Sequence, residues 1–96
     1  MKFLALEKEQ PGLTQEDFLP YLRDEAAHVW ELYCNGVLRE TYFREDLHTA
    51  VLIMECKTTM EARQVLASLP LVQAGLISFE IIPLLPYDGF ARLFST

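Results

Sequence analysis

The sequence contains few of the residues that build metal centres and disulfide frameworks. It has two cysteines, Cys34 and Cys56, and two histidines among its 96 residues. Disulfide-stapled scaffolds and zinc sites both need more of these residues at close spacing. We therefore expect a protein of the reducing cytoplasm that uses neither a metal nor another cofactor.

Basic residues and long apolar runs are scarce as well. Eight basic residues stand against fourteen acidic ones, for a net charge of -6, and such a field repels the phosphates of nucleic acid and anionic lipid. No apolar run approaches the roughly 20 residues that span a bilayer, so we expect neither a nucleic-acid nor a membrane partner. With four glycines, five prolines and 51 % hydrophobic residues, the chain has the composition of one globular domain over residues 1–96.

The chain does contain a regular succession of strand and helix signals. Short apolar runs bounded by turn residues predict strands, and capping residues followed by apolar residues at spacings of three and four predict helices. The expected strands are residues 2–9, 37–44, 49–56 and 76–85, and the expected helices begin after Thr14 and Thr58 and end near Gly36 and Pro70. This order predicts an α+β fold, the ferredoxin-like βαββαβ arrangement, with both helices on one face of an antiparallel sheet.

The first helix is expected to be long and amphipathic. Pro20 falls within its first two turns and predicts a kink or a restart there. Apolar residues at helical spacing predict one stripe: Phe18, Leu22, Ala26, Val29, Trp30 and Tyr33. Trp30 on this stripe either belongs to the core or lines a small-molecule pocket, and we count it as a candidate substrate-binding residue.

The strands carry apolar residues on both faces. Residues 50–54 and the pair Ile81 and Ile82 are apolar at successive positions, although two helices cover only one face of a sheet. Each large apolar side chain left in water forgoes about 1.5–3 kcal/mol of burial. We therefore predict a homodimer whose sheets pack together in a barrel-like core, with the apolar tail 86–96 docking on the partner.

Three short motifs carry a family resemblance: Gly36-Val37-Leu38-Arg39, the Arg44-x-x-x-His48 spacing, and Leu69-Pro70-Leu71. Together with the element order, they resemble the muconolactone isomerase-like proteins of the dimeric α+β barrel superfamily. The resemblance implies binding of a small organic acid or lactone, isomerisation by cofactor-free proton transfer, and assembly beyond the dimer. The chain departs from the family pattern at Glu40, where a histidine is expected, and after Pro86.

The second strand concentrates the side chains that such a reaction needs. Cofactor-free isomerisation requires a general base and a cation or donor that holds the carboxylate or developing enolate. Strand alternation predicts Glu40, Tyr42 and Arg44 on one face and Arg39 on the other. We assign Glu40 and Tyr42 to proton transfer and Arg39 and Arg44 to the substrate. The alternative is an edge strand that is protected from aggregation by its charges.

His48 completes the set of candidate catalytic residues. An unperturbed imidazole titrates near pH 6.5, which suits proton transfer, although a solvated histidine is also ordinary in a hairpin loop. Glu55 and Glu80 lie in apolar strands; they become candidate bases if they face the barrel interior and are ordinary solvated carboxylates if they face out.

Two other functions remain open from the sequence. One is a non-enzymatic dimeric or oligomeric module with a barrel filled by side chains, and the other is a cofactor-independent monooxygenase that holds its substrate against Trp30 or Tyr42. A pocket lined by a carboxylate or histidine together with an arginine favours an enzyme, whereas solid packing around the second strand favours the module.

Overall fold

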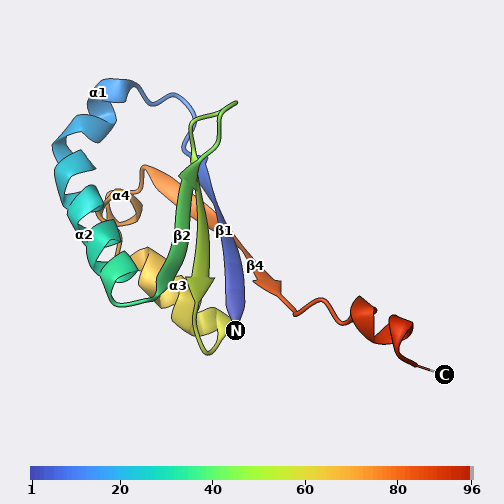
Figure 1. The fold of residues 1–96 in the computed structure, drawn as a ribbon. Coiled ribbons are helices and arrows are strands. Elements are labelled where there is room, and N and C mark those ends of the chain that lie inside the picture. The colour runs from blue at the N-terminus through green and yellow to red at the C-terminus, as the bar shows by residue number, and fades with distance from the viewer. Residues whose placement is uncertain (96) are drawn as a thin grey trace.

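The computed structural model describes residues 1–95 and contains one four-stranded antiparallel sheet with its helices on one face (Figure 1). The strands lie in the order β2-β3-β1-β4, which confirms the predicted ferredoxin-like fold. The elements are β1 (Lys2–Glu9), α1 (Gln15–Phe18), a 3₁₀ helix (Leu19–Tyr21), α2 (Leu22–Cys34), β2 (Leu38–Phe43), β3 (Ala50–Glu55), α3 (Thr59–Ala67), α4 (Pro70–Gln73), β4 (Ile77–Leu84) and a second 3₁₀ helix (Gly89–Leu93). No helix within residues 1–95 is long and apolar enough to cross a membrane.

The first helical region restarts at Pro20, as predicted. The Thr14 N–H donates to the Asp17 carboxylate at 2.7 Å, which fixes the start of α1. Pro20 then lies in the 3₁₀ helix that separates α1 from α2, because proline cannot continue the α-helical hydrogen-bond ladder. Gly36 ends the region with a φ of +85°, a backbone angle that glycine adopts without a steric penalty.

The face that α2 turns towards the sheet differs from the predicted stripe. Leu32 is the buried residue of this helix, and Glu25, His28 and Val29 are half-buried beside it. Trp30 is 64 % exposed, so the large aromatic side of α2 faces away from the core. Both sets of residues have helical spacing, and Leu32 rather than the larger Trp30 joins the buried cluster that contains Leu38 and Leu69.

The second half of the chain begins with the predicted cap. The Thr58 hydroxyl accepts a hydrogen bond from the Glu61 N–H at 3.1 Å, and α3 runs from there to Ala67. Pro70 then opens the short helix α4, where its missing N–H has no partner to lose. The last strand, β4, lies at an edge of the sheet, which is where Pro83 near its end is tolerated.

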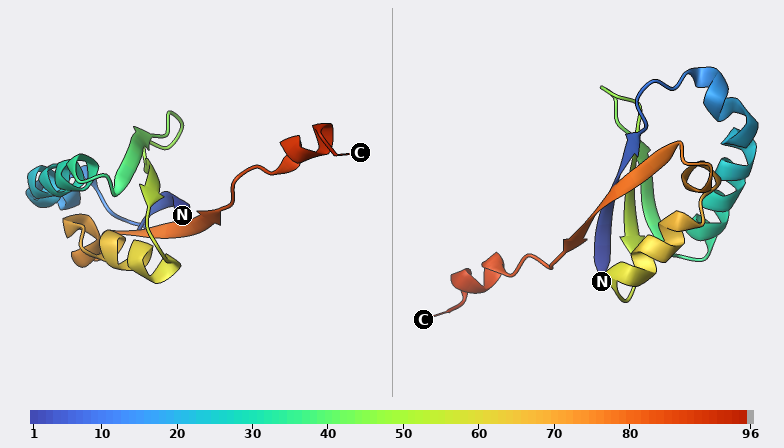
Figure 2. Two further views of the ribbon diagram at one scale, coloured as in Figure 1. Left: turned by 60° about the horizontal axis from the view of Figure 1, so that its bottom comes forward. Right: turned by 180° about the vertical axis from the view of Figure 1, so that it is seen from behind.

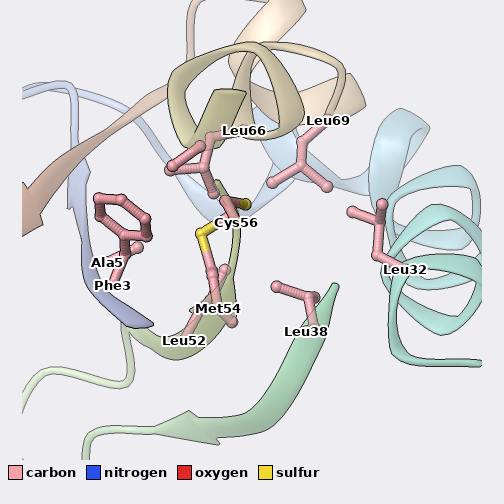
Figure 3. Packing of buried hydrophobic residues seen from close by; sticks show 10 residues of the cluster. Phe3, Ala5, Leu32, Leu38, Leu52, Met54, Cys56, Leu66 and Leu69 are labelled. Atoms are coloured by element: carbon pink, nitrogen blue, oxygen red, sulfur yellow. The ribbon is translucent and has the colours of Figure 1, made fainter. Parts of the chain in front are cut away.

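The strand register separates two apolar faces of the sheet. Towards the helices point the buried residues Phe3, Ala5, Leu38, Leu52 and Met54, which form the core with Leu32, Leu66 and Leu69 (Figure 3). On the opposite, open face lie Leu4, Leu6, Val51, Ile53, Ile82 and Leu84, all half-buried. Figure 2 shows that no helix of the described chain lies over this face. The prediction that the strands are apolar on both faces is therefore confirmed.

The chain after β4 runs away from the sheet as an arm, residues 85–95 (Figure 1). Because of this arm the described chain measures 60 Å in its longest dimension, against 28 and 20 Å in the others. Tyr87 and Phe90 pack edge to face at 4.9 Å within the arm, yet both are exposed. The arm is therefore an apolar segment that its own domain leaves in water.

Candidate functional site

An open hollow of about 360 Å³ lies between the end of β1 and the loop that joins β2 to β3. The last residue pair between β1 and β3 joins Leu6 to Val51, so beyond Leu6 the strand no longer has β3 beside it and the loop stands in its place. The lining consists of Leu6, Glu7, Lys8, Glu9, Arg44, Leu47, Thr49 and Glu80. This combination of carboxylates with an arginine is the feature that the sequence analysis named as favouring an enzyme.

Glu7 is the carboxyl group of this hollow that burial alters most. Strand alternation turns it to the same side as Phe3 and Ala5, and it accepts a hydrogen bond from the Ala50 N–H at 3.1 Å. Burial raises the pKa of Glu7 above its usual range, and the neighbouring charges of Glu9 and Glu25 raise it further. The bond from Ala50 and the charge of His48 oppose this rise in pKa. A carboxyl group in such surroundings exchanges a proton closer to neutral pH than a solvated one does.

His48 sits beside Glu7 in a constrained loop. Its φ of +53° is in the left-handed region, and its ring stacks on that of Phe43 with centroids 4.4 Å apart. The His48 N–H donates to the Arg44 carbonyl at 2.9 Å, and the Arg44 N–H donates to the Thr49 carbonyl at 2.8 Å. These bonds fix the loop and keep the His48 ring close enough to Glu7 for a protonated imidazole to lower the pKa of that carboxyl.

Arg44 borders the hollow with part of its guanidinium already engaged. Its Nε and one terminal nitrogen donate to the two carboxylate oxygens of Asp46, at 2.9 and 2.6 Å. A guanidinium carries five N–H donors, so the remaining ones can still receive an anion. The same pair lowers the pKa of Asp46, which keeps that carboxylate ionised.

Glu40 and Tyr42 form a separate pair on β2. The Tyr42 hydroxyl donates to the Glu40 carboxylate at 2.5 Å, and this bond raises the pKa of Tyr42. They lie opposite Ile53 and Val51, so both are on the open face, as the alternation predicted. Neither residue lines the hollow, and their assignment to proton transfer stays a prediction.

Arg39 departs from the predicted alternation. The register shifts between Leu38 and Glu40, so Arg39 is the extra residue of a β-bulge rather than a residue of the opposite face. Its Nε donates to the Gly36 carbonyl at 2.6 Å. Its charge helps to lower the pKa of Glu55, after the larger effect of the amino terminus. The simple alternation that placed Arg39 on the face opposite Glu40 therefore does not hold, because the bulge interrupts the period of two.

The remaining candidates lie away from the hollow or at its border. Trp30 stacks on Tyr33 at 5.9 Å on the outer side of α2, and its role in substrate binding stays a prediction. Glu55 is on the open face, paired with the amino terminus and with Lys2 at 3.7 Å. The hydrogen bond from the amino terminus lowers the pKa of Glu55 and outweighs the opposing effect of desolvation. Glu80, also on the open face, is exposed at the border of the hollow.

Sequence reasoning missed Glu7 and one half-buried carboxyl group of the helix layer, Glu25, which lies near the half-buried His28. The Glu25 carboxylate accepts from the Leu71 N–H at 3.0 Å, and burial raises its pKa. His28 bonds to the Ser68 hydroxyl at 2.7 Å through Nε2; because that hydroxyl donates to the Val65 carbonyl, Nε2 is the donor. The available signals were the period of two that aligns Glu7 with Phe3 and Ala5, and the helical spacing that aligns Glu25 with Val29 and Leu32. Among the described residues, no three His, Cys, Asp or Glu side chains converge as a metal site.

Comparisons with known proteins agree on the fold. No family model matches the sequence, and no curated protein matches it. Several solved structures do, among them the following two. 5-Chloro-2-hydroxyhydroquinone dehydrochlorinase from Burkholderia phenoliruptrix, in complex with 2,5-dihydroxybenzoquinone, superposes with a TM-score of 0.72 at 19 % identity, over 88 % of this chain and 94 % of that one. Muconolactone isomerase superposes with a TM-score of 0.76 at 16 % identity, over 92 % of each chain. The chain therefore has the muconolactone isomerase fold, and the predicted resemblance is confirmed at that level.

Proposed function

We propose that this protein is a cytoplasmic homodimer that binds a small oxygenated acid or lactone and transfers a proton on it without a cofactor. The observation that carries the proposal is the raised pKa of Glu7 in a hollow that also holds Arg44. Both structural neighbours are named for reactions of small oxygenated compounds, a lactone and a chlorinated hydroxyhydroquinone. Both cysteines are free thiols, as a reducing compartment requires.

The proposed reaction needs a general base and a group that binds the substrate anion. Glu7, held by the Ala50 N–H, takes a proton from a carbon or hydroxyl group of the substrate and returns it at another position. The free N–H groups of Arg44 hold the carboxylate or the developing enolate, whose negative charge they stabilise. His48 lies beside Glu7 and relays the proton or holds it between the two steps.

The homodimer covers the open face of the sheet. Six half-buried apolar side chains on that face would each gain, from burial against a second copy, part of the about 1.5–3 kcal/mol that full burial of an exposed side chain contributes. A second sheet packed on this face also closes the side of the hollow formed by Leu6, Lys8 and Glu80, which point to the open face. Water would then be excluded from this side of the hollow, which strengthens the electrostatic contacts there.

The proposal is tested with the two compounds that the neighbours suggest. We expect muconolactone or 2,5-dihydroxybenzoquinone to raise the melting temperature of the wild-type protein, since a ligand of the folded state stabilises it. Proton exchange of muconolactone in D2O is then followed by NMR. Glu7→Gln should retain the shift in melting temperature and lose about 10²–10⁴-fold in exchange rate, the usual contribution of a general base.

Glu16→Gln is the matched control, because Glu16 is an exposed residue of α1 away from the hollow. It should leave the exchange rate unchanged. Full activity in Glu7→Gln would remove the proposed base, and the absence of any ligand-induced shift would contradict the substrate class.

The oxygenase remains the alternative that uses other residues. It predicts consumption of oxygen in the presence of a quinol, with sensitivity to Tyr42→Phe rather than to Glu7→Gln. The non-enzymatic module predicts neither exchange nor oxygen consumption. The hollow with its carboxylate and arginine favours the proton-transfer reaction over the module.

A further inference from the structure

The arm, residues 85–95, carries a concentration of apolar side chains that its own domain does not use. Leu85, Tyr87, Phe90, Leu93 and Phe94 are all exposed, Phe94 by 82 %. The segment is nevertheless ordered into a short 3₁₀ helix, with Gly89 buried under the Tyr87 ring. An ordered apolar segment in water indicates a surface that is covered by something else.

A groove on the helix side of the sheet is apolar and therefore complements the apolar arm. It lies between α3, α4 and the edge strand β4, with a volume of about 270 Å³. Its walls are apolar, formed by Leu66, Ala67, Val72, Phe79 and Ile81, and Arg63 is the charged residue of its lining. The arm carries two charged residues, Asp88 between its aromatic side chains and Arg92 further on, and Asp88 can pair with the Arg63 cation of the groove.

The chain's own arm leaves from the wrong end of β4 to fill this groove. The groove is formed by the first half of β4, residues 78–81, whereas the arm departs after Leu84 and runs outward (Figures 1 and 2). The arm of a second copy is better placed if the strands of the two copies run antiparallel. The end of the second copy's β4 then lies over the start of the first copy's β4, beside the first copy's groove.

The charges of the open face favour that antiparallel orientation. The amino terminus, Lys2 and Arg39 gather around the single carboxylate of Glu55, which leaves a positive surplus at this end of the face. Parallel strands in the dimer would bring two such ends together, and like charges in contact disfavour that arrangement. Antiparallel strands keep the two ends apart.

The length of the arm is sufficient for the crossing. Packed sheets are about 10 Å apart, and the groove lies just beyond the partner's sheet on its helix side. The five residue steps from Leu85 to Phe90 span about 17 Å when extended at roughly 3.3 Å each. Phe90 can therefore reach past the edge of the partner's sheet.

We infer that the arm of each copy crosses to the second copy and inserts Phe90 into the groove between α3, α4 and β4, with Asp88 beside Arg63. The inference rests on the proposed homodimer and adds the place and the partner of the arm. Two arms are exchanged per dimer, because a two-fold axis repeats the contact.

The test is a disulfide between two chains, in a Cys34→Ser background that removes the exposed native thiol. One full-length variant carries Phe90→Cys, and a second carries Ala67→Cys at the groove. The two proteins are mixed, allowed to exchange subunits, and oxidised with oxidised glutathione. Both positions are exposed, so the substitutions leave the core untouched.

We expect a covalent heterodimer with the Ala67→Cys partner, identified by mass spectrometry of the linked peptides. A control partner carrying Ala27→Cys, exposed on α2, should give none, because cysteines whose Cα atoms are more than about 7 Å apart do not bridge. Sedimentation of the same mixture measures whether a dimer forms, independently of where the arm docks. A dimer that forms no bond at the groove overturns the arm's docking and leaves the dimer standing. A single sedimenting chain overturns both.

Discussion

Glu7 places an ionisable carboxyl group on the helix-facing side of an apolar strand. Its strand neighbours on the helix-facing side, Phe3 and Ala5, are fully buried, so the carboxyl group enters the same layer at its border. A carboxylate loses favourable hydration there, and one hydrogen bond from Ala50 returns part of it. The group that results accepts and releases a proton more readily near neutral pH than a surface glutamate does.

The raised pKa of Glu7 predicts a pH dependence of stability. An acid whose pKa is higher in the folded than in the unfolded chain contributes fully below the unfolded value, near 4.5, and less as the pH rises through the folded value. The free energy of unfolding of Glu7→Gln should therefore gain on that of the wild type as the pH rises from about 4 towards 7. Urea titrations at several pH values measure this difference.

Glu16→Gln is again the control, and its difference from the wild type should not grow in this way. A constant difference between Glu7→Gln and the wild type across the whole range would show that Glu7 is not desolvated.

The residues of the candidate site were predictable by type and only partly by arrangement. The sequence indicated Arg44 and His48 through their spacing, and both are found at or beside one hollow. It could not show that Asp46 would bind the Arg44 guanidinium, or that Glu40 and Tyr42 would bind each other, since such pairings depend on rotamers and loop geometry. Glu7 escaped attention because a charged residue near a strand end is usually solvated.

At the scale of elements, the chain order and the caps were predictable, and the rotation of α2 was not. Capping residues, Pro20 and Gly36 act through local geometry, so their effects can be deduced from neighbouring residues alone. The buried side of α2 depends on how the helix meets β2, a contact between segments. Two apolar stripes compete on this helix, and Leu32 is buried while the larger Trp30 stays outside.

The cap of α3 gives a test of an element's local stability. Thr58→Ala removes the hydroxyl that accepts the Glu61 N–H and should lower the free energy of unfolding by about 1 kcal/mol, within a range of roughly 0.5–2 kcal/mol. Thr59→Ala changes the next residue, whose hydroxyl is not the cap, and should cost less. Chemical denaturation of both variants provides the measurement, and an equal loss in the two would exclude the cap as the cause.

At the scale of the whole molecule, the apolar residues on both sides of the sheet are the dominant feature. The helices cover one side, and the other presents a continuous apolar surface from β3 across β1 to β4. This feature could be predicted from the sequence, because successive apolar residues in a strand must point to both faces. The direction of the arm could not, since under the proposed exchange of arms it depends on contacts with a second chain.

Ile53 lies near the middle of that open face, opposite Leu4 and Glu40. Ile53→Lys removes an apolar side chain from each copy and puts two cations into the contact. At about 1.5–3 kcal/mol for each lost side chain, the dimer dissociation constant should rise about 100-fold or more. Sedimentation equilibrium at micromolar concentration measures the change.

Met60→Lys, on the exposed side of α3, is the matched control and should leave the dissociation constant unaltered. Unchanged association of Ile53→Lys would show that copies meet through another surface.

The two margins of the sheet have a consequence for assembly. Fibrils grow when a regular edge strand offers its unpaired N–H and C=O groups to incoming chains. Here the bulge at Arg39 disrupts the edge strand β2, and Pro83 leaves the edge strand β4 without one backbone N–H donor. A protein with this much apolar strand surface would otherwise be prone to amyloid. Within residues 1–95 both margins are interrupted, so growth by strand addition is disfavoured and the apolar surface is left to face-to-face association, which closes on itself.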